Sequence, residues 1–214
     1  MPNVLKKSRR ERLAAFQKTL VYPVVSSEFC SREVIETVRQ ILAAGAGIVQ
    51  LREKRMPARD FLAYARACRT IADEFGALII IDDHVDIALA ANADGVHLGQ
   101  EDLPVAAARA LAPQLILGVS THNEAEIADA QAQDCDYLNI GPIFETQTKE
   151  VQYPAVGQTE LERLIPKIKI PFSVMGGIKA QHVPALRKIG VKHIAAVTAF
   201  TQAGDIAQVL AQFS

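Results

Sequence analysis

The feature that most constrains the fold is the regular alternation of short apolar runs with helical segments along nearly the whole chain. Each run is five or six residues long and rich in β-branched and aliphatic side chains, which is typical of buried parallel strands. Alanine- and leucine-rich segments with helical spacing lie between them, for example at 57–75 and 123–134. The expected strands cover residues 20–25, 47–52, 77–81, 95–99, 115–119, 137–141, 171–176 and 193–198.

The junctions between these segments also repeat. "AAGAGIVQL", "AANADGVHL", "AQDCDYLNI" and "RKIGVKHIA" each end a helix in small residues, turn, and enter a strand. Eight such units predict an α/β fold of the (β/α)8 TIM-barrel type. An open, doubly wound sheet is the alternative, but it would carry a glycine-rich nucleotide fingerprint after the first strand, and "VVSSEF" is not one.

Length and composition are those of one domain. The chain has 214 residues, half of them hydrophobic, and a net charge of −1. We expect the barrel to span residues 20–214, after an N-terminal helical extension at 1–19. The basic stretch "LKKSRRERLAAFQK" (5–18) is predicted to form an amphipathic helix that packs on the domain. Ser31 is expected to cap the helix that begins in "SREV" (31–34).

Charge and cysteine content limit the partners and the compartment. A near-neutral charge predicts no nucleic-acid partner, and the lack of a long apolar run predicts no membrane span. Three widely separated cysteines without CxxC spacing fit a reducing compartment, so we expect a cytoplasmic protein. A homo-oligomer is an open alternative to a monomer, because the outer helices of barrels often self-associate.

Polar side chains cluster directly after the expected strands. In a barrel these positions share one rim, which is where the active sites of this fold lie. We expect no comparable polar set at the other ends of the strands. The rim set comprises Ser26 and Ser27, Arg52 and Lys54, Asp82 and Asp83, Gln100 and Asp102, Ser120 to His122, the loop 142–157, Gly176 and Gly177, and Thr198.

Asp83 and Asp102 follow neighbouring strands and are candidate ligands of one divalent cation. Mg²⁺ fits best, because it commonly takes one or two carboxylates, keeps several waters and binds substrate phosphates. Alternatively, Asp102 caps the helix that starts at Pro104. Together with Arg52, Lys54 and Lys149, two such carboxylates suit a substrate that carries several negative charges, such as a diphosphate.

A second anion site is predicted where "VMGGI" (174–178) and "AVTAF" (196–200) end the last two strands. Glycines there let backbone N–H groups approach a phosphate, and barrels frequently bind phosphate at this place. The alternative is a tight turn that merely needs glycine.

Among the histidines, only His122 stands on the rim beside a Ser–Thr pair. It could shuttle a proton or orient a loop. His97 lies inside a strand and is expected to be structural, and His182 and His193 are expected away from the rim.

Several dense motifs in this order resemble the thiamine-phosphate synthase family. The resemblance runs from about Leu20 to Ala207 and rests on "VQLREK" (49–54), "ADGVHLGQEDLP" (93–104), "GVSTH" (118–122), "GPIFETQTK" (141–149), "MGGI" (175–178) and "AVTA" (196–199). It implies a barrel enzyme that joins hydroxymethylpyrimidine diphosphate to a thiazole phosphate. Diphosphate is released with the help of Mg²⁺.

The resemblance also implies residue roles. Gln50 would contact the pyrimidine ring, Ser120 the pyrimidine side, and Asp83 with Asp102 the Mg²⁺. Arg52, Lys54, Lys149 and Ser120 would be the catalytic residues. The remaining substrate contacts would be Asp82, Thr146, Thr148, Gly177, Val197 and Thr198.

The chain departs from the family at Asp82, where the family usually has an asparagine that helps to hold the diphosphate. A carboxylate would repel the diphosphate by about 1–4 kcal/mol at about 4 Å, or it would join the metal shell. Thr198 replaces the usual serine, and "YPVVSSEF" replaces the usual end of the first strand.

Two other functions compete with the synthase. The related thiazole tautomerase uses a histidine at the position of His122, and a non-catalytic barrel could bind thiamine precursors. The tautomerase lacks the full diphosphate set. Arg52, Lys54, Asp83, Asp102, Thr148 and Lys149 together favour the synthase.

Overall fold

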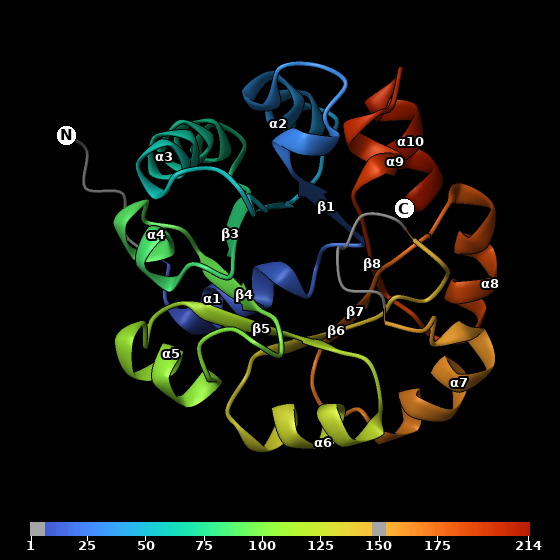
Figure 1. Ribbon diagram of the computed structural model, residues 1–214. Coiled ribbons are helices and arrows are strands. Elements are labelled where there is room, and N and C mark those ends of the chain that lie inside the picture. Colours follow the sequence, from blue (N-terminus) through green and yellow to red (C-terminus); the bar gives the residue numbers. More distant parts are fainter. Residues whose placement is uncertain (1–6, 147–152) are drawn as a thin grey trace.

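Eight parallel strands form a closed barrel, each paired with the next along the chain, and β8 closes on β1 (Figure 1). The computed structural model describes residues 7–146 and 153–214. The strands are β1 (Val21–Val25), β2 (Ile48–Leu51), β3 (Leu78–Asp82), β4 (Gly95–Leu98), β5 (Ile116–Thr121), β6 (Tyr137–Ile140), β7 (Phe172–Val174) and β8 (His193–Ala196). They coincide with the eight predicted runs, so the predicted (β/α)8 barrel is confirmed.

Helices surround the strands as an outer ring (Figure 1). Within the described ranges, none is both long and apolar enough to cross a bilayer. The α-helices are α1 (Arg9–Phe16), α2 (Val34–Ala43), α3 (Ala58–Phe75), α4 (Val85–Ala90), α5 (Val105–Leu111), α6 (Glu124–Ala132), α7 (Gly157–Leu164), α8 (Val183–Lys188), α9 (Thr198–Thr201) and α10 (Ile206–Phe213). The 3₁₀ turns are η1 (Ser27–Phe29), η2 (Ile165–Lys167) and η3 (Ala180–His182).

The start of α2 differs from the prediction. Glu33, not Ser31, is the N-cap, and its side chain accepts a hydrogen bond from the Glu36 backbone N–H. The Ser31 hydroxyl donates instead to the Thr201 carbonyl at 3.2 Å, which joins this loop to α9. The prediction was wrong because a tertiary partner outcompeted the local cap.

The interior of the barrel is filled by a layer of apolar and aromatic side chains separate from the core under the helices. Successive strand residues point alternately into the barrel and toward the helices, so a strand such as β1 contributes to both layers. The inward layer consists of Phe16, Tyr22, Val24, Ile48, Leu78, Ile80, Ile116, Tyr137, Ala195 and Val197. It forms the floor on which the rim pocket rests.

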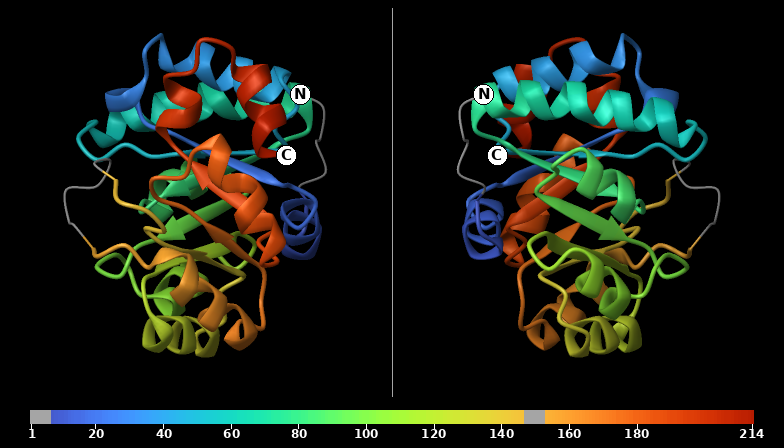
Figure 2. Two further views of the ribbon diagram at one scale, coloured as in Figure 1. Left: turned by 90° about the vertical axis from the view of Figure 1, so that its right-hand side faces the viewer. Right: turned by 90° about the vertical axis from the view of Figure 1, so that its left-hand side faces the viewer.

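Helix α1 closes the barrel at the end opposite the rim loops (Figure 2). Phe16 is fully buried there, with its ring 4.4 Å from that of Tyr137 and 4.9 Å from the imidazole of His193. The Ser8 hydroxyl and the Glu11 side chain form a capping box at the start of the helix. The predicted N-terminal helix that packs on the domain is therefore present, over the shorter range Arg9–Phe16.

The expectation of no polar set at the N-terminal ends of the strands was wrong. Asp94 precedes β4 and pairs with Arg12 and Arg69, and Asp136 precedes β6 and pairs with Arg9 and Arg109. Both carboxylates also accept a backbone N–H from a neighbouring strand. Each carboxylate therefore has two arginine partners, and these ion pairs form a structural network that anchors α1.

His193 in this floor gives the protein a pH-dependent stability. Burial lowers the pKa of its imidazole to about 4, and a hydrogen bond with the Thr19 backbone offsets only part of this effect. The unfolded chain takes up a proton below about pH 6.5, whereas the folded chain does so only near pH 4. Stability is therefore full above pH 6.5 and falls as the pH drops toward 4.

We expect His193 to account for up to about 3 kcal/mol of the stability that the protein loses between pH 6.5 and 4. Urea unfolding of the wild type and of His193→Gln between pH 7.5 and 4 measures it. The variant should show a shallower pH dependence, and identical slopes would contradict the assignment.

Candidate active site

Two carboxylates and a lysine meet at the rim above β2, β3 and β4. Lys54 Nζ contacts Asp83 Oδ2, and the Asp83 and Asp102 carboxyl groups lie within hydrogen-bonding reach of each other. Burial and the neighbouring Asp83 raise the pKa of Asp102, although the Gly99 N–H and Lys54 act in the opposite direction. Asp83 has φ of 62°, a left-handed conformation that is uncommon outside glycine and often marks functional sites. The predicted meeting of the two acids is thus seen.

This pair suits a magnesium ion better than a transition metal. No cluster of three or more His, Cys, Asp or Glu side chains that could hold a metal occurs in residues 7–146 and 153–214. Two adjacent carboxylates, one of them with a raised pKa at Asp102, are the donor set that Mg²⁺ accepts when waters and substrate phosphates complete its shell.

Asp102 does not cap the following helix. Its Oδ2 accepts the Gly99 N–H at 2.6 Å, and no side chain caps α5, whose N-cap is Pro104. The alternative interpretation of Asp102 as a helix cap was therefore wrong, because the carboxylate turns back to the end of β4 and faces Asp83.

Asp82 lies beneath this cluster and is buried. Its Oδ2 is 3.5 Å from Arg52 Nε and 3.4 Å from Lys54 Nζ. Burial opposes the charge on Lys54, but Asp82 and Asp83 outweigh it and raise the lysine pKa. The two cations predicted to hold a diphosphate therefore share one internal counter-ion.

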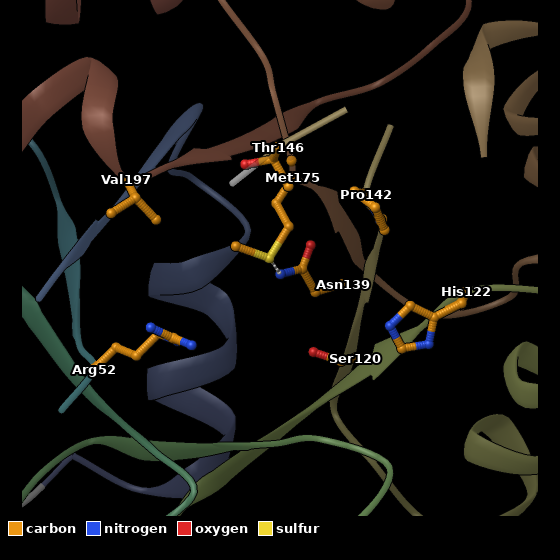
Figure 3. Close-up of a pocket in the computed structure, with 10 residues that line it drawn as sticks. Arg52, Ser120, His122, Asn139, Pro142, Thr146, Met175 and Val197 are labelled. Carbon is orange, nitrogen blue, oxygen red and sulfur yellow. Dashed lines mark hydrogen bonds between the residues drawn. The ribbon is translucent and has the colours of Figure 1, made fainter. Parts of the chain in front are cut away.

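A pocket opens beside this cluster at the C-terminal ends of the strands (Figure 3). Four predicted site residues line it, namely Arg52, Ser120, Thr146 and Val197. Asn139, Pro142 and Met175 add an amide and an apolar wall. Polar groups placed singly in a mostly apolar pocket are what a small organic ligand requires.

A chain of buried hydrogen bonds runs through the barrel to the pocket. Gln50 Nε2 donates to Tyr22 Oη at 2.9 Å, and Tyr22 Oη is 2.9 Å from Tyr137 Oη. Tyr137 Oη is 3.2 Å from His97 Nδ1, and His97 Nε2 is 2.9 Å from Ser120 Oγ. His97 is therefore a partnered structural histidine, as predicted. Gln50, predicted to contact the pyrimidine, lies inside the barrel with its amide bound to Tyr22.

The first of the two predicted phosphate loops, which follows β7, packs against the loop after β6. Gly177 has φ of 63°, and a Cβ there would lie 2.5 Å from the Glu145 carbonyl oxygen, so this position requires glycine. The Phe144 N–H donates to the Gly176 carbonyl at 3.0 Å, which ties the loop after β6 to the loop after β7. Val197 is buried, and Thr198 is exposed at the start of α9.

His122 lines the pocket, and its ring contacts Glu126 and Tyr153. Its Nδ1 is 2.7 Å from Glu126 Oε2, and its ring stacks on that of Tyr153 at 3.7 Å between centroids. These contacts orient the ring; the proposed proton shuttle stays a prediction. His182 lies after β7 and its ring contacts that of Phe144 in the loop after β6, at 4.1 Å between centroids and an interplanar angle of 34°. It therefore lies on the rim side, contrary to expectation, whereas His193 lies in the floor.

Thr148 and Lys149 lie outside the described residues. Sequence reasoning missed Glu53, whose carboxylate accepts the Ser27 N–H at 2.7 Å and the Ser27 hydroxyl at 2.6 Å and so joins the loops after β1 and β2. It also missed Tyr22, Tyr137 and Asn139. The signal in the sequence that could have identified these three residues is their place on strands, where alternate side chains point into the barrel.

A parallel barrel that gathers carboxylates and cations at the C-terminal rim defines a class of enzyme that acts on phosphorylated small molecules. The comparisons with known proteins agree. Residues 21–200 match the family model described as thiamine monophosphate synthase. The chain therefore belongs to the thiamine monophosphate synthase family.

Individual relatives support this membership. A thiamine-phosphate synthase of Pelotomaculum thermopropionicum is 39% identical over 200 residues, 92% of each chain, and one of Dictyoglomus thermophilum is 36% identical over 93% of this chain and 90% of its own. The structure of thiamine phosphate pyrophosphorylase from Pyrococcus furiosus superimposes with a TM-score of 0.84 at 33% identity, covering 92% of this chain and 95% of that one. The predicted family and the prediction of an enzyme of this type are confirmed.

Proposed function

We propose that this chain catalyses the transfer of hydroxymethylpyrimidine from its diphosphate to a thiazole phosphate, giving thiamine phosphate and diphosphate. The observation that carries this proposal is the convergence of Lys54, Asp83 and Asp102 at one point of the rim, beside a pocket suited to a small ring. Such a cluster serves a diphosphate leaving group, which the tautomerase reaction does not have.

In the proposed reaction, the bond between the pyrimidine methylene carbon and the diphosphate oxygen breaks first. Its electron pair leaves with the diphosphate, and the thiazole nitrogen then supplies the pair for the new C–N bond. Arg52 and Lys54, with Lys149, hold the charge that develops on the leaving oxygen. No enzymic nucleophile or strong base is required.

Asp83 and Asp102 would hold Mg²⁺. When bound, the ion would neutralise part of the diphosphate charge and make it a better leaving group. Lys54, which contacts Asp83, would add its own positive charge on the same side of the diphosphate. The donor set supports this assignment, which is our proposal for the cofactor.

Asp82 holds the cations in place in this account. Because it lies within 3.5 Å of both Arg52 and Lys54, its charge is already compensated, and the repulsion expected from the sequence is offset. We assign it to orienting these two side chains.

Ser120 and Thr146 would contact the pyrimidine part and the leaving group, and Thr148 belongs to the same predicted set. The thiazole phosphate would bind at the loops after β7 and β8, through the backbone at Gly177, Val197 and Thr198. Gln50 would act on the pyrimidine through the buried chain that ends at Ser120.

The test is product formation by the purified protein. With both substrates and Mg²⁺ we expect thiamine phosphate, and a chelator should suppress it to background. Product formed equally with and without chelator would reject the metal-dependent mechanism. Interconversion of thiazole isomers that depends on His122, without product, would establish the tautomerase instead.

We also propose a cytoplasmic location and no nucleic-acid or membrane partner. The three cysteines are free thiols, and two of them are buried. Self-association into a homo-oligomer stays a prediction.

A further inference from the structure

Asn139 carries a buried hydrogen-bond acceptor that no described residue satisfies. The residue lies on β6, is 2% exposed and lines the pocket. Its Nδ2 donates to Met175 Sδ at 2.8 Å, which fixes the amide in one orientation (Figure 3). Its Oδ1 is left with no hydrogen-bond partner among residues 7–146 and 153–214. Because buried acceptors are almost always paired, this oxygen points to a ligand that brings a donor.

Ser120 lies next to Asn139 and offers a hydrogen-bond donor to the pocket, where Asn139 offers an acceptor. The two residues are direct partners in the register of β5 and β6, and both line the pocket. The Gln50 amide nitrogen can only donate to Tyr22, and the nearest acceptor for the proton of Tyr22 itself is the Tyr137 hydroxyl. When each tyrosine donates along the chain in this way, Tyr22 donates to Tyr137, Tyr137 to His97 Nδ1, and His97 Nε2–H to Ser120 Oγ. The hydroxyl proton of Ser120 is therefore available to an acceptor in the pocket.

We propose that Asn139 and Ser120 together read the amino edge of the pyrimidine substrate. Asn139 Oδ1 accepts the exocyclic amino N–H, and the Ser120 hydroxyl donates to the adjacent ring nitrogen. This inference rests on the proposed function and assigns a specificity-determining residue to it. A donor beside an acceptor on neighbouring strands complements an acceptor beside a donor on the ring.

The chemistry of the two substrates decides which one Asn139 contacts. The thiazole phosphate has no N–H group, and its phosphate is an acceptor at neutral pH. The aminopyrimidine is the substrate that carries an N–H donor. The amide of Gln50 is engaged by Tyr22 in the barrel interior, and among the described residues that line the pocket Asn139 supplies the side-chain amide.

The same contact assists the reaction. When the bond to diphosphate breaks, positive charge spreads from the methylene carbon onto the ring and the amino nitrogen. The amino N–H becomes a stronger donor, so its hydrogen bond to Asn139 Oδ1 strengthens in the transition state. Loss of Asn139 should therefore lower kcat as well as raise KM for the pyrimidine substrate.

The experiment measures binding by calorimetry with two probes, the monophosphate of the aminopyrimidine alcohol and its analogue without the amino group. We expect the wild type to bind the amino compound about 10- to 100-fold more tightly than the analogue. In Asn139→Leu this preference should fall to within about threefold, with the affinity for thiazole phosphate unchanged. Ser173→Ala, which removes a buried hydroxyl on the neighbouring β7 outside the pocket, should behave as the wild type.

The inference is overturned if Asn139→Leu keeps the wild-type preference, or if the wild type does not distinguish the two probes. Asn139→Ala answers the same question should the leucine variant not fold. Failure of the proposed function looks different, because the wild type would then bind neither probe and form no thiamine phosphate.

Discussion

Asp83→Asn is expected to lower thiamine phosphate formation by at least about 100-fold at saturating Mg²⁺. The change removes one of the two carboxylates proposed to bind the metal and leaves Lys54 without its closest counter-ion. A loss of this size corresponds to about 3 kcal/mol in the activation free energy, which is typical when a charged group acting on a developing anion is removed.

Asparagine is the appropriate replacement because residue 83 has φ of 62°. Asparagine tolerates this left-handed conformation, whereas alanine would add backbone strain to the loss of charge. Asp86→Asn, an exposed carboxylate in the first turn of α4, is the matched control and should retain full activity. A rate for Asp83→Asn within threefold of the wild type would contradict the assignment.

Phe16→Ala is expected to lower the free energy of unfolding by about 3–5 kcal/mol. The side chain is fully buried in the floor of the barrel against Tyr22, Tyr137 and His193, so its removal leaves a cavity lined by rings. Urea unfolding followed by circular dichroism measures the loss. Phe75→Ala, at the exposed C-terminal end of α3, should cost less than about 1 kcal/mol.

Phe16→Ala also tests whether the barrel depends on the N-terminal segment for its stability. The division of the chain at residue 20 stays a prediction, and the packing of Phe16 argues that α1 stabilises the barrel. A loss below 1 kcal/mol for Phe16→Ala would contradict that role. Because Tyr22 and Tyr137 belong to the chain that ends at Ser120, we expect the variant to lose activity as well.

The positions of the strands and the composition of the rim could be predicted from sequence because both depend on local patterns. Buried parallel strands read as short apolar runs, and the C-terminal ends of neighbouring strands meet wherever the barrel closes. Asp83 and Asp102 therefore could be paired before any coordinates were known. They follow β3 and β4, which pair in parallel with Asp82 opposite His97 at this end.

Contacts between distant side chains could not be predicted in this way. Asp94 and Asp136 were not singled out from the sequence, because the arginines that neutralise them lie far away in the chain, on α1, α3 and α5. Asp82 looked like a repulsive charge until its two cations were placed beside it. Asn139 looked like one polar residue in a buried strand, and its unpaired carbonyl emerges only from the packing of Met175.

The central claim is that the charged side chains of the rim act together on a metal-bound diphosphate. Calorimetric titration of the purified protein with inorganic diphosphate, with and without Mg²⁺, tests it most directly. We expect binding to be at least tenfold tighter with Mg²⁺ in the wild type, and this gain to vanish in Asp83→Asn. Equal affinity with and without the metal, or an undiminished gain in the variant, would contradict the claim.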